Sequence, residues 1–242
     1  MSGGSVVVHG LGKLFHHSLP RYRSLIGRLR RAWEGGAARI PVWALRDVSF
    51  EVSPGDCLGI IGPNGSGKST LLGILAGILE PTEGTARVNG RTSTYFNLDA
   101  GLQDELSVRD NIEICGVLMG LRRREILRRI PAILEFSELA GLSEVRMGEL
   151  STGQAARAAF AAAIHSDLEV LLVDEALSVG DRSFQDKCQG AFARLRRDGK
   201  TLIVASHDED MLRGMASRIL RLGAGRVESL EEISPALEPS HG

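Results

Sequence analysis

The sequence has few cysteines, and their arrangement does not suit a disulfide framework. Cys57, Cys115 and Cys188 are odd in number, lie far apart and show no CxxC spacing. Secreted domains that depend on disulfides carry an even number of cysteines at shorter spacings. We therefore expect reduced thiols in the core of a protein that works in a reducing compartment.

Long hydrophobic runs and an excess of one charge are also missing. An apolar run such as residues 170–173 is far shorter than the roughly 20 residues that cross a bilayer. Gly3, Gly4 and His9 interrupt the one candidate for a secretion signal. The formal net charge is -1, so no overall field draws the chain onto nucleic acid. We predict a protein that is not secreted, binds no nucleic acid and needs another chain to cross a membrane.

The composition that remains is that of a globular protein, with 43% hydrophobic and 24% charged residues among 242. Short apolar segments separated by helical patterns predict buried strands of a parallel α/β sheet. These segments are residues 57–61, 170–173 and 201–205. A pair of short segments near residues 219–222 and 226–227 predicts two closing strands, and turn residues between 81 and 90 predict a hairpin.

Three further regions are expected beside this core. The period of residues 104–163 is helical and predicts an inserted helical subdomain. Residues 18–36 place aromatic and aliphatic side chains on one stripe and arginines elsewhere, which predicts a basic amphipathic helix between two early strands. This helix could be a solvated face, but we expect it to lie near a membrane, against anionic lipid headgroups or facing an anionic saccharide-lipid. The domain is expected to end near residue 228, with residues 229–242 as a short flexible tail.

A glycine-rich string joins the predicted strand at residues 57–61 to a predicted helix. It reads GPNGSGKST and matches the phosphate-binding pattern G-x-x-x-x-G-K-[ST]. Glycines let backbone N–H groups face phosphates, the Lys68 ammonium neutralises their charge and the Ser69 hydroxyl can ligate Mg²⁺. The string predicts an Mg-ATP site formed by Gly62, Pro63, Asn64, Gly65, Ser66, Gly67, Lys68, Ser69 and Thr70.

Two other predicted strands end in polar side chains. Residues 170–173 lead into Asp174 and Glu175, and residues 201–205 lead into His207. Ligands of open α/β sheets bind at the carboxyl edge, where these ends meet. We expect Asp174 to hold Mg²⁺, Glu175 to orient or deprotonate the attacking water, and His207 to bond the γ-phosphate or that water.

Residues 150–154 read LSTGQ and lie between the glycine-rich string and the acidic strand. With these motifs in this order, the sequence resembles the ATP-binding-cassette (ABC) transporter ATPase family, whose signature is LSGGQ. The resemblance implies an α/β P-loop NTPase core with an antiparallel β subdomain and an inserted helical subdomain. It also implies a homodimer, in which Ser151, Gly153 and Gln154 contact the ATP held by the partner's P-loop. Asp181 matches the D-loop aspartate of the family.

Two family positions have alternative matches. The aromatic residue that stacks on adenine matches Phe15 best, with Trp43 as the second candidate. The glutamine that ligates Mg²⁺ matches Asn97 by spacing, with Gln103 as the alternative. The resemblance implies no metal other than Mg²⁺.

The segments DAGLQDELSVRDNI and DEALSVGDRSFQDKC narrow the resemblance to ATPase subunits of bacterial polysaccharide exporters, which serve capsule, O-antigen and teichoic-acid export. This implies an energy-coupling ATPase that is peripheral to the cytoplasmic face of the bacterial inner membrane and works with an integral membrane permease. The cargo would be a polysaccharide or lipid-linked glycan. Alternatives are an exporter of a lipid, drug or protein, and a soluble ABC protein without a transport role.

Overall fold

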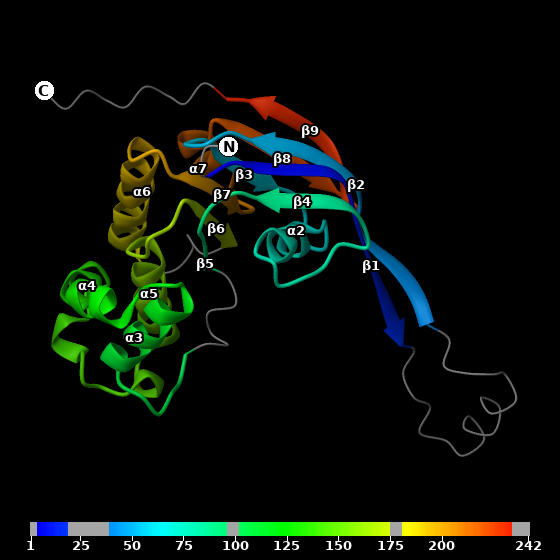
Figure 1. Cartoon of the computed structure of the whole chain (residues 1–242). Helices are drawn as coiled ribbons and strands as arrows, with labels where there is room; N and C mark the ends of the chain where they lie inside the picture. Colours follow the sequence, from blue (N-terminus) through cyan, green and yellow to red (C-terminus); the bar gives the residue numbers. More distant parts are fainter. Residues whose placement is uncertain (1–3, 19–38, 96–101, 175–180, 234–242) are drawn as a thin grey trace, which may run out of the picture.

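The computed structural model describes residues 4–18, 39–95, 102–174 and 181–233. Within these residues the strands form a six-stranded sheet in the order β5-β6-β7-β3-β8-β9 and a three-stranded sheet in the order β2-β1-β4 (Figure 1). The strands are β1 (Val6–Ser18), β2 (Arg39–Val52), β3 (Cys57–Ile61), β4 (Glu83–Val88), β5 (Thr92–Tyr95), β6 (Val170–Asp174), β7 (Thr201–Ala205), β8 (Arg218–Gly223) and β9 (Arg226–Glu232).

Some α-helices pack on the larger sheet and others form a helical lobe beside it, and α5 contributes residues to the hydrophobic clusters of both. Helices α3, α4 and α5 gather beside the sheet, at the lower left of Figure 1, whereas α2 lies below the strands of the smaller sheet. The α-helices are α2 (Lys68–Leu75), α3 (Val108–Leu118), α4 (Arg123–Phe136), α5 (Thr152–Ile164), α6 (Arg182–Arg197) and α7 (Glu209–Met215). The predicted α/β fold with an antiparallel sheet and an inserted helical lobe is confirmed.

The central strands of the larger sheet are buried on both faces. In β6, Leu171 and Val173 belong to a hydrophobic cluster with α5 and α6, whereas Val170 and Leu172 belong to a cluster with α2, β1 and β2. Strands covered on both sides need apolar residues at every position. The larger sheet is therefore a middle layer, and its ends are held rigidly where the polar motifs begin.

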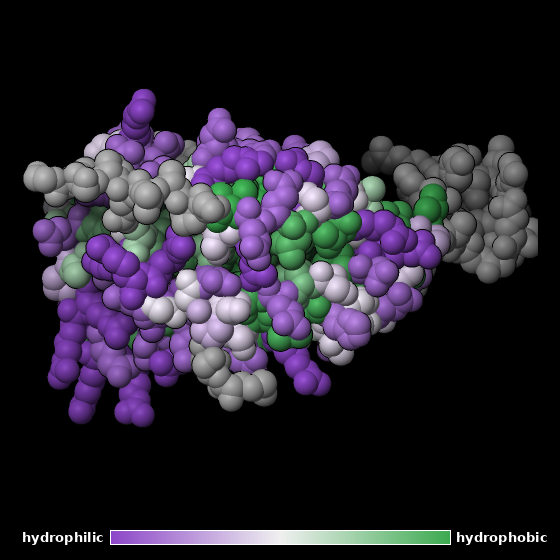
Figure 2. Space-filling view, turned by 90° about the horizontal axis from the view of Figure 1, so that it is seen from above, coloured by the Kyte–Doolittle hydropathy of each residue, from purple (hydrophilic) through white to green (hydrophobic). Residues whose placement is uncertain are grey.

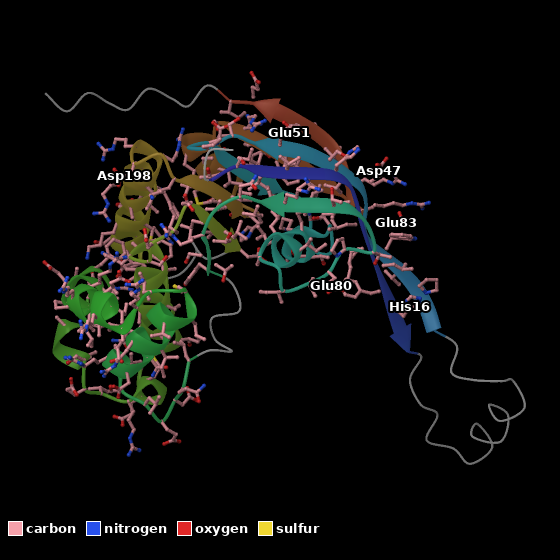
Figure 3. All side chains as sticks on the ribbon, in the orientation of Figure 1. His16, Asp47, Glu51, Glu80, Glu83 and Asp198 are labelled. Carbon is pink, nitrogen blue, oxygen red and sulfur yellow. The ribbon has the colours of Figure 1, made fainter. Side chains whose placement is uncertain are left out.

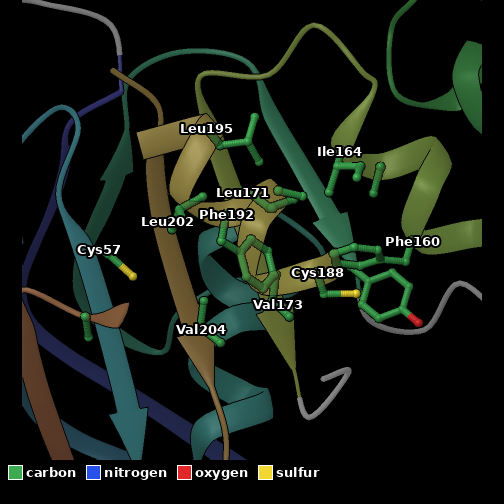
Figure 4. Packing of buried hydrophobic residues seen from close by; sticks show 14 of the residues in the cluster. Cys57, Phe160, Ile164, Leu171, Val173, Cys188, Phe192, Leu195, Leu202 and Val204 are labelled. Atoms are coloured by element: carbon green, nitrogen blue, oxygen red, sulfur yellow. The ribbon is translucent and has the colours of Figure 1, made fainter. Parts of the chain in front are cut away.

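An aromatic cluster joins the helical lobe to this sheet. Phe160 of α5 is 1% exposed, and its ring lies 5.6 Å from that of Phe192 (Figure 4). The same ring lies 5.1 Å from that of Tyr95 and 6.3 Å from that of Phe184. Perpendicular ring pairs of this kind add to the energy of burial. Since these rings come from β5, α5 and α6, the cluster fixes the position of α5, the signature helix, which begins within the LSTGQ segment.

The prediction of a hairpin between residues 81 and 90 is wrong. Strand β4 pairs with β1 in the smaller sheet, and β5 pairs with β6 in the larger one. Gly90 carries the chain between the sheets with φ 119°, and a Cβ there would lie 2.7 Å from Oε2 of Glu169. Turn residues mark where the chain changes direction, but they do not show which strand comes next to which.

Strands β1 and β2 are longer than their short apolar segments predict. Strands β1 and β2 pair from Val6 opposite Val52 to Ser18 opposite Arg39. The end that carries His16 extends away from the helices (Figure 3). Residues 19–38, which contain nearly all of the predicted basic helix, lie outside the described residues, and Ser18 is the last residue of β1.

All three cysteines are buried, and burial raises the pKa of Cys57 and Cys188 to about 12. Among the described residues, no helix is long and apolar enough to span a bilayer.

The face on the side of β8 and β9 is largely hydrophilic with a band of hydrophobic atoms (Figure 2). Strand β9 continues to Glu232, so residues 229–232 pair with β8 instead of belonging to the tail.

Replacing Phe160 with alanine should lower the free energy of unfolding by about 3–5 kcal/mol, because the cluster would keep a cavity at its centre. Urea denaturation followed by circular dichroism measures this change. The control Leu118→Ala removes a side chain of α3 that is 73% exposed and should stay within about 0.5 kcal/mol of the parent. Equal losses for both variants would contradict the role given to the aromatic cluster.

Candidate functional site

The polar motifs that follow β3, β6 and β7 lie at one edge of the larger sheet. Ala205 of β7 is level with Ile60 of β3 and with Asp174 of β6. The amide of Ser206 donates to the Ile60 carbonyl over 3.1 Å. The strands are parallel, so the glycine-rich loop, Asp174 and the residues after β7 leave the sheet in the same direction. The structure therefore brings these motifs together as the sequence indicates.

The glycine-rich loop turns tightly into α2. The Ser66 amide donates to the Pro63 carbonyl over 3.1 Å, and the Leu71 amide donates to the Gly67 carbonyl over 2.9 Å. Gly67 precedes the helix with φ 106°, a left-handed conformation that favours glycine. A Cβ on Gly67 would lie 2.5 Å from the Ala44 carbonyl oxygen, so β2 also requires glycine here.

Strands distant in sequence hold the loop in this shape. A Cβ on Gly62 would lie 2.2 Å from the carbonyl oxygen of Leu222, at the end of β8. The amide of Gly225, in the β8–β9 turn, donates to the Ser66 carbonyl over 3.1 Å, and the Arg46 amide donates to the Gly225 carbonyl over 2.8 Å. The loop is thus fixed by β2 and the β8–β9 turn as well as by its own glycines.

The LSTGQ segment begins a helix in the other lobe. Ser151 caps α5: its hydroxyl accepts from the Gln154 amide over 3.3 Å, and its own amide donates to Oε1 of Gln154 over 3.0 Å. A Cβ on Gly153 would meet nothing within 4 Å. Thr152 stands in the first turn of α5 and is exposed. Figure 1 shows α5 in the helical lobe, apart from α2, so the LSTGQ segment does not meet the loop of its own chain.

Asp181 is held within the chain by two contacts. Its Oδ1 accepts from the Phe184 amide over 3.0 Å, which caps α6, and its Oδ2 lies 3.1 Å from the Arg157 guanidinium. The helix cap and then the guanidinium lower the pKa of the Asp181 carboxyl. The carboxylate is therefore charged at neutral pH and joins α6 to α5.

The two candidate aromatic residues lie on the β1–β2 hairpin. Phe15 is opposite Val42, and Trp43 is opposite Leu14. Successive cross-strand pairs point to opposite faces, so the two rings lie on opposite sides. The Lys13 ammonium is 5.2 Å from the Phe15 ring centre. A Cβ on Gly12 would lie 3.1 Å from Trp43, so this ring packs on the strand itself.

Two expected site residues, Glu175 and Asn97, lie outside the described residues. His207 is exposed after β7, and Asp208 beside it caps α7 through the Met211 amide over 3.0 Å. Gln103 lies among the described residues, and its backbone forms hydrogen bonds with a side chain that was missed as a candidate from the sequence.

That missed residue is Asn111 of α3, which is 1% exposed. Its Oδ1 accepts from the Gln103 amide over 2.7 Å, and its Nδ2 donates to the carbonyls of Gln103 over 3.0 Å and Ser107 over 2.9 Å. A polar residue at an apolar helical position is the signal that would have identified it. Asn111 fixes the chain where it enters the helical lobe.

A family model described as "ABC transporter" matches residues 45–178, more than half of the chain. This chain belongs to the ABC transporter family. The teichoic acids export ATP-binding protein TagH of Lactococcus lactis subsp. lactis (strain IL1403) is 38% identical over 199 residues. The O-antigen export system ATP-binding protein RfbB of Klebsiella pneumoniae is 33% identical over 225 residues, covering 93% of this chain and 91% of that protein.

The lengths of these relatives differ. The matched part of this chain covers 42% of the Lactococcus lactis protein, with 81% of this chain matched, and 56% of a Listeria innocua relative of the same name. Among solved structures, a dimeric ATP-binding cassette in a post-hydrolysis state bound to ADP and Pi has a TM-score of 0.77 at 23% identity over 96% of this chain and all of that chain. Its likeness shows that the fold is that of ABC cassettes.

The loop of this ABC family chain has the features that a phosphate group requires. Lys68 is 5% exposed, and its ammonium donates to the carbonyls of Gly62 over 2.7 Å and Pro63 over 3.3 Å, which holds the positive charge over the loop. A Cβ on Gly65 would meet nothing within 4 Å, so the loop backbone can be approached there. Backbone amides at the start of α2 add positive potential. The residues present therefore fit an anionic phosphate chain.

The fit to Mg²⁺ depends on oxygen donors. Ser69 is exposed in the first turn of α2, and Asp174 is partly exposed at the end of β6. The described residues hold no group of three or more histidine, cysteine or acidic side chains that could bind a metal alone. Mg²⁺ is commonly bound by one or two protein oxygens together with phosphates, and this donor set suits that mode.

Replacing Gly67 with alanine should weaken ATP binding by at least about tenfold, since the new Cβ meets the Ala44 carbonyl and the backbone is left-handed. Equilibrium titration with a fluorescent ATP analogue measures the affinity. The matched control is Gly190→Ala in α6, where a Cβ meets nothing within 4 Å. Unchanged affinity in Gly67→Ala would show that the approach to β2 does not shape the loop.

Proposed function

We propose that this chain is the ATP-hydrolysing, energy-coupling subunit of an ABC exporter whose cargo is a polysaccharide or lipid-linked glycan. The observation that carries the proposal is the match to the Klebsiella pneumoniae O-antigen export protein over 91% of its length. The teichoic acid export relatives support the same class of cargo. We place the chain at the cytoplasmic face of the bacterial inner membrane, as a peripheral subunit beside an integral permease.

In this proposal, the residues of the loop from Gly62 to Thr70 hold the phosphates of ATP. Ser69 and Asp174 would hold Mg²⁺, whose charge offsets that of the β- and γ-phosphates. Glu175 would orient or deprotonate the attacking water, and His207 would bond the γ-phosphate or that water. The level ends of β3, β6 and β7 support this grouping, since all three motifs leave the sheet at one edge.

We further propose that two copies of the chain complete each ATP site. Ser151 and Thr152, at the start of α5, are exposed in the helical lobe, apart from the loop that leads into α2. The amides at the start of α5 can receive an anion that another molecule presents. The dimeric form of the solved cassette supports this arrangement. Gly153, Gln154 and Asp181 would lie near the same interface.

The substitutions Glu175→Gln and Lys68→Ala should separate hydrolysis from binding. Glu175→Gln should reduce the rate of ATP hydrolysis by about 100-fold or more while ATP still binds, because the base is lost and the loop is kept. Lys68→Ala should lose affinity for ATP, because the ammonium over the loop is removed. Phosphate release and nucleotide titration on the purified chain measure the two effects.

Export is tested in cells that lack the chromosomal gene. The parent chain should restore the surface glycan, and Glu175→Gln should not, when glycan is measured by immunoblot of whole cells at equal protein levels. Copurification with an integral membrane protein in detergent should accompany the recovery. A normal hydrolysis rate in Glu175→Gln would contradict the assigned base, and an unchanged surface glycan in the deletion strain would contradict the assigned cargo.

A further inference from the structure

Arg157, six residues after Ser151 on α5, contacts charged side chains of two other elements. Its guanidinium lies 2.6 Å from Oε2 of Glu138, just beyond α4, and 3.1 Å from Oδ2 of Asp181, at the start of α6. Lys187 of α6 lies 2.7 Å from the other oxygen of Glu138. We call these four side chains the charge cluster. It joins the end of α4, the signature helix and the start of α6.

The geometry at Arg157 is more constrained than that of an ordinary surface ion pair. Its side chain is 15% exposed, and its guanidinium lies 4.6 Å from the ring centre of Phe184, which is itself buried. A planar guanidinium held on an aromatic ring can bond two carboxylates at fixed directions. Arg157 thus sets the position of α5 relative to α6.

The backbone at Glu138 has a conformation that glutamate rarely adopts. The Glu138 amide donates to the Glu135 carbonyl over 3.1 Å, and the Leu139 amide donates to the Leu134 carbonyl over 2.9 Å. These bonds form a Schellman motif at the end of α4, with Glu138 in its left-handed position at φ 63°. Glycine is the residue that this position favours. A glutamate here keeps an unfavourable conformation and uses its carboxylate to hold Arg157 and Lys187.

The pKa shifts and hydrogen bonds of the two carboxyl groups agree with a structural connection between α4, α5 and α6. The hydrogen bond from Lys187 lowers the pKa of the Glu138 carboxyl, and the charge of Arg157 acts in the same direction. Both carboxylate oxygens of Asp181 are engaged within the chain, one by the α6 cap and one by Arg157.

We propose that Arg157 and Glu138 are positioning residues for hydrolysis. They hold the Ser151 end of α5 and the Asp181 end of α6 as one unit, so that the two segments reach the nucleotide in a fixed relation. Neither side chain touches the nucleotide in this scheme. The inference rests on the proposed function, because it concerns the rate of the ATPase that the loop and Glu175 support.

The test uses Glu138→Gly in the full chain. This change removes the carboxylate and also relieves the left-handed backbone, so the melting temperature should stay within about 4 °C of the parent. The kcat for ATP hydrolysis should fall by roughly threefold to thirtyfold. The affinity for a fluorescent ATP analogue should stay within about twofold, since the loop lies in the other lobe.

Two further variants sharpen the result. Arg157→Lys keeps the positive charge but removes the planar guanidinium that contacts both carboxylates. Its kcat should therefore lie between those of the parent and Glu138→Gly. Glu113→Gln breaks an ion pair with Arg123 inside the helical lobe. It should leave kcat unchanged, because that pair does not reach α6.

Unchanged kcat in Glu138→Gly would overturn the proposal. It would also be overturned if kcat fell together with melting temperature or ATP affinity, or if Glu113→Gln lowered kcat as much, because each result indicates a general structural effect. Normal hydrolysis in both Glu175→Gln and Lys68→Ala would instead contradict the proposed function. Loss of hydrolysis in those two variants with normal kcat in Glu138→Gly contradicts the positioning role alone.

Discussion

Close packing of backbone against backbone around the phosphate-binding loop is the constraint on which the site depends. Gly62 and Gly67 leave no room for a Cβ because carbonyl oxygens of Leu222 and Ala44 stand at 2.2 and 2.5 Å from the positions it would take. These carbonyls belong to β8 and β2, so the loop keeps its shape only while the two sheets stay packed together. The same packing keeps the Lys68 ammonium over the loop.

The second half of the proposed site depends on a different set of contacts. The signature helix α5 is held to the larger sheet by the rings around Phe160 and to α6 by Arg157. The loop and the start of α5 are therefore positioned by different contacts, although α5 and the strand that precedes the loop share one hydrophobic cluster. A protein built in this way can bind nucleotide with one part and present its signature to a second molecule with the other.

The elements whose chemistry is local could be predicted from the sequence. The glycine-rich string, the buried runs before Asp174 and His207, and the helical lobe all follow from spacing and period, because each signal lies within a few residues. The hairpin predicted near Gly90 does not form, since pairing of β4 with β1 and of β5 with β6 depends on strands far away in sequence. The charge cluster could not be predicted from the sequence, because the left-handed backbone of Glu138 forms only where α4 ends.

If two copies of the chain complete each ATP site, two variants that are each defective in a different half of the site should restore activity when they are mixed. Lys68→Ala lacks a working loop, and Ser151→Arg replaces the exposed cap of α5 with a bulky cation. Each should be inactive alone. An equimolar mixture should regain ATP hydrolysis, because a mixed dimer pairs an intact loop with an intact signature. A mixture no more active than the mean of its components would show that one copy of the chain forms the site alone.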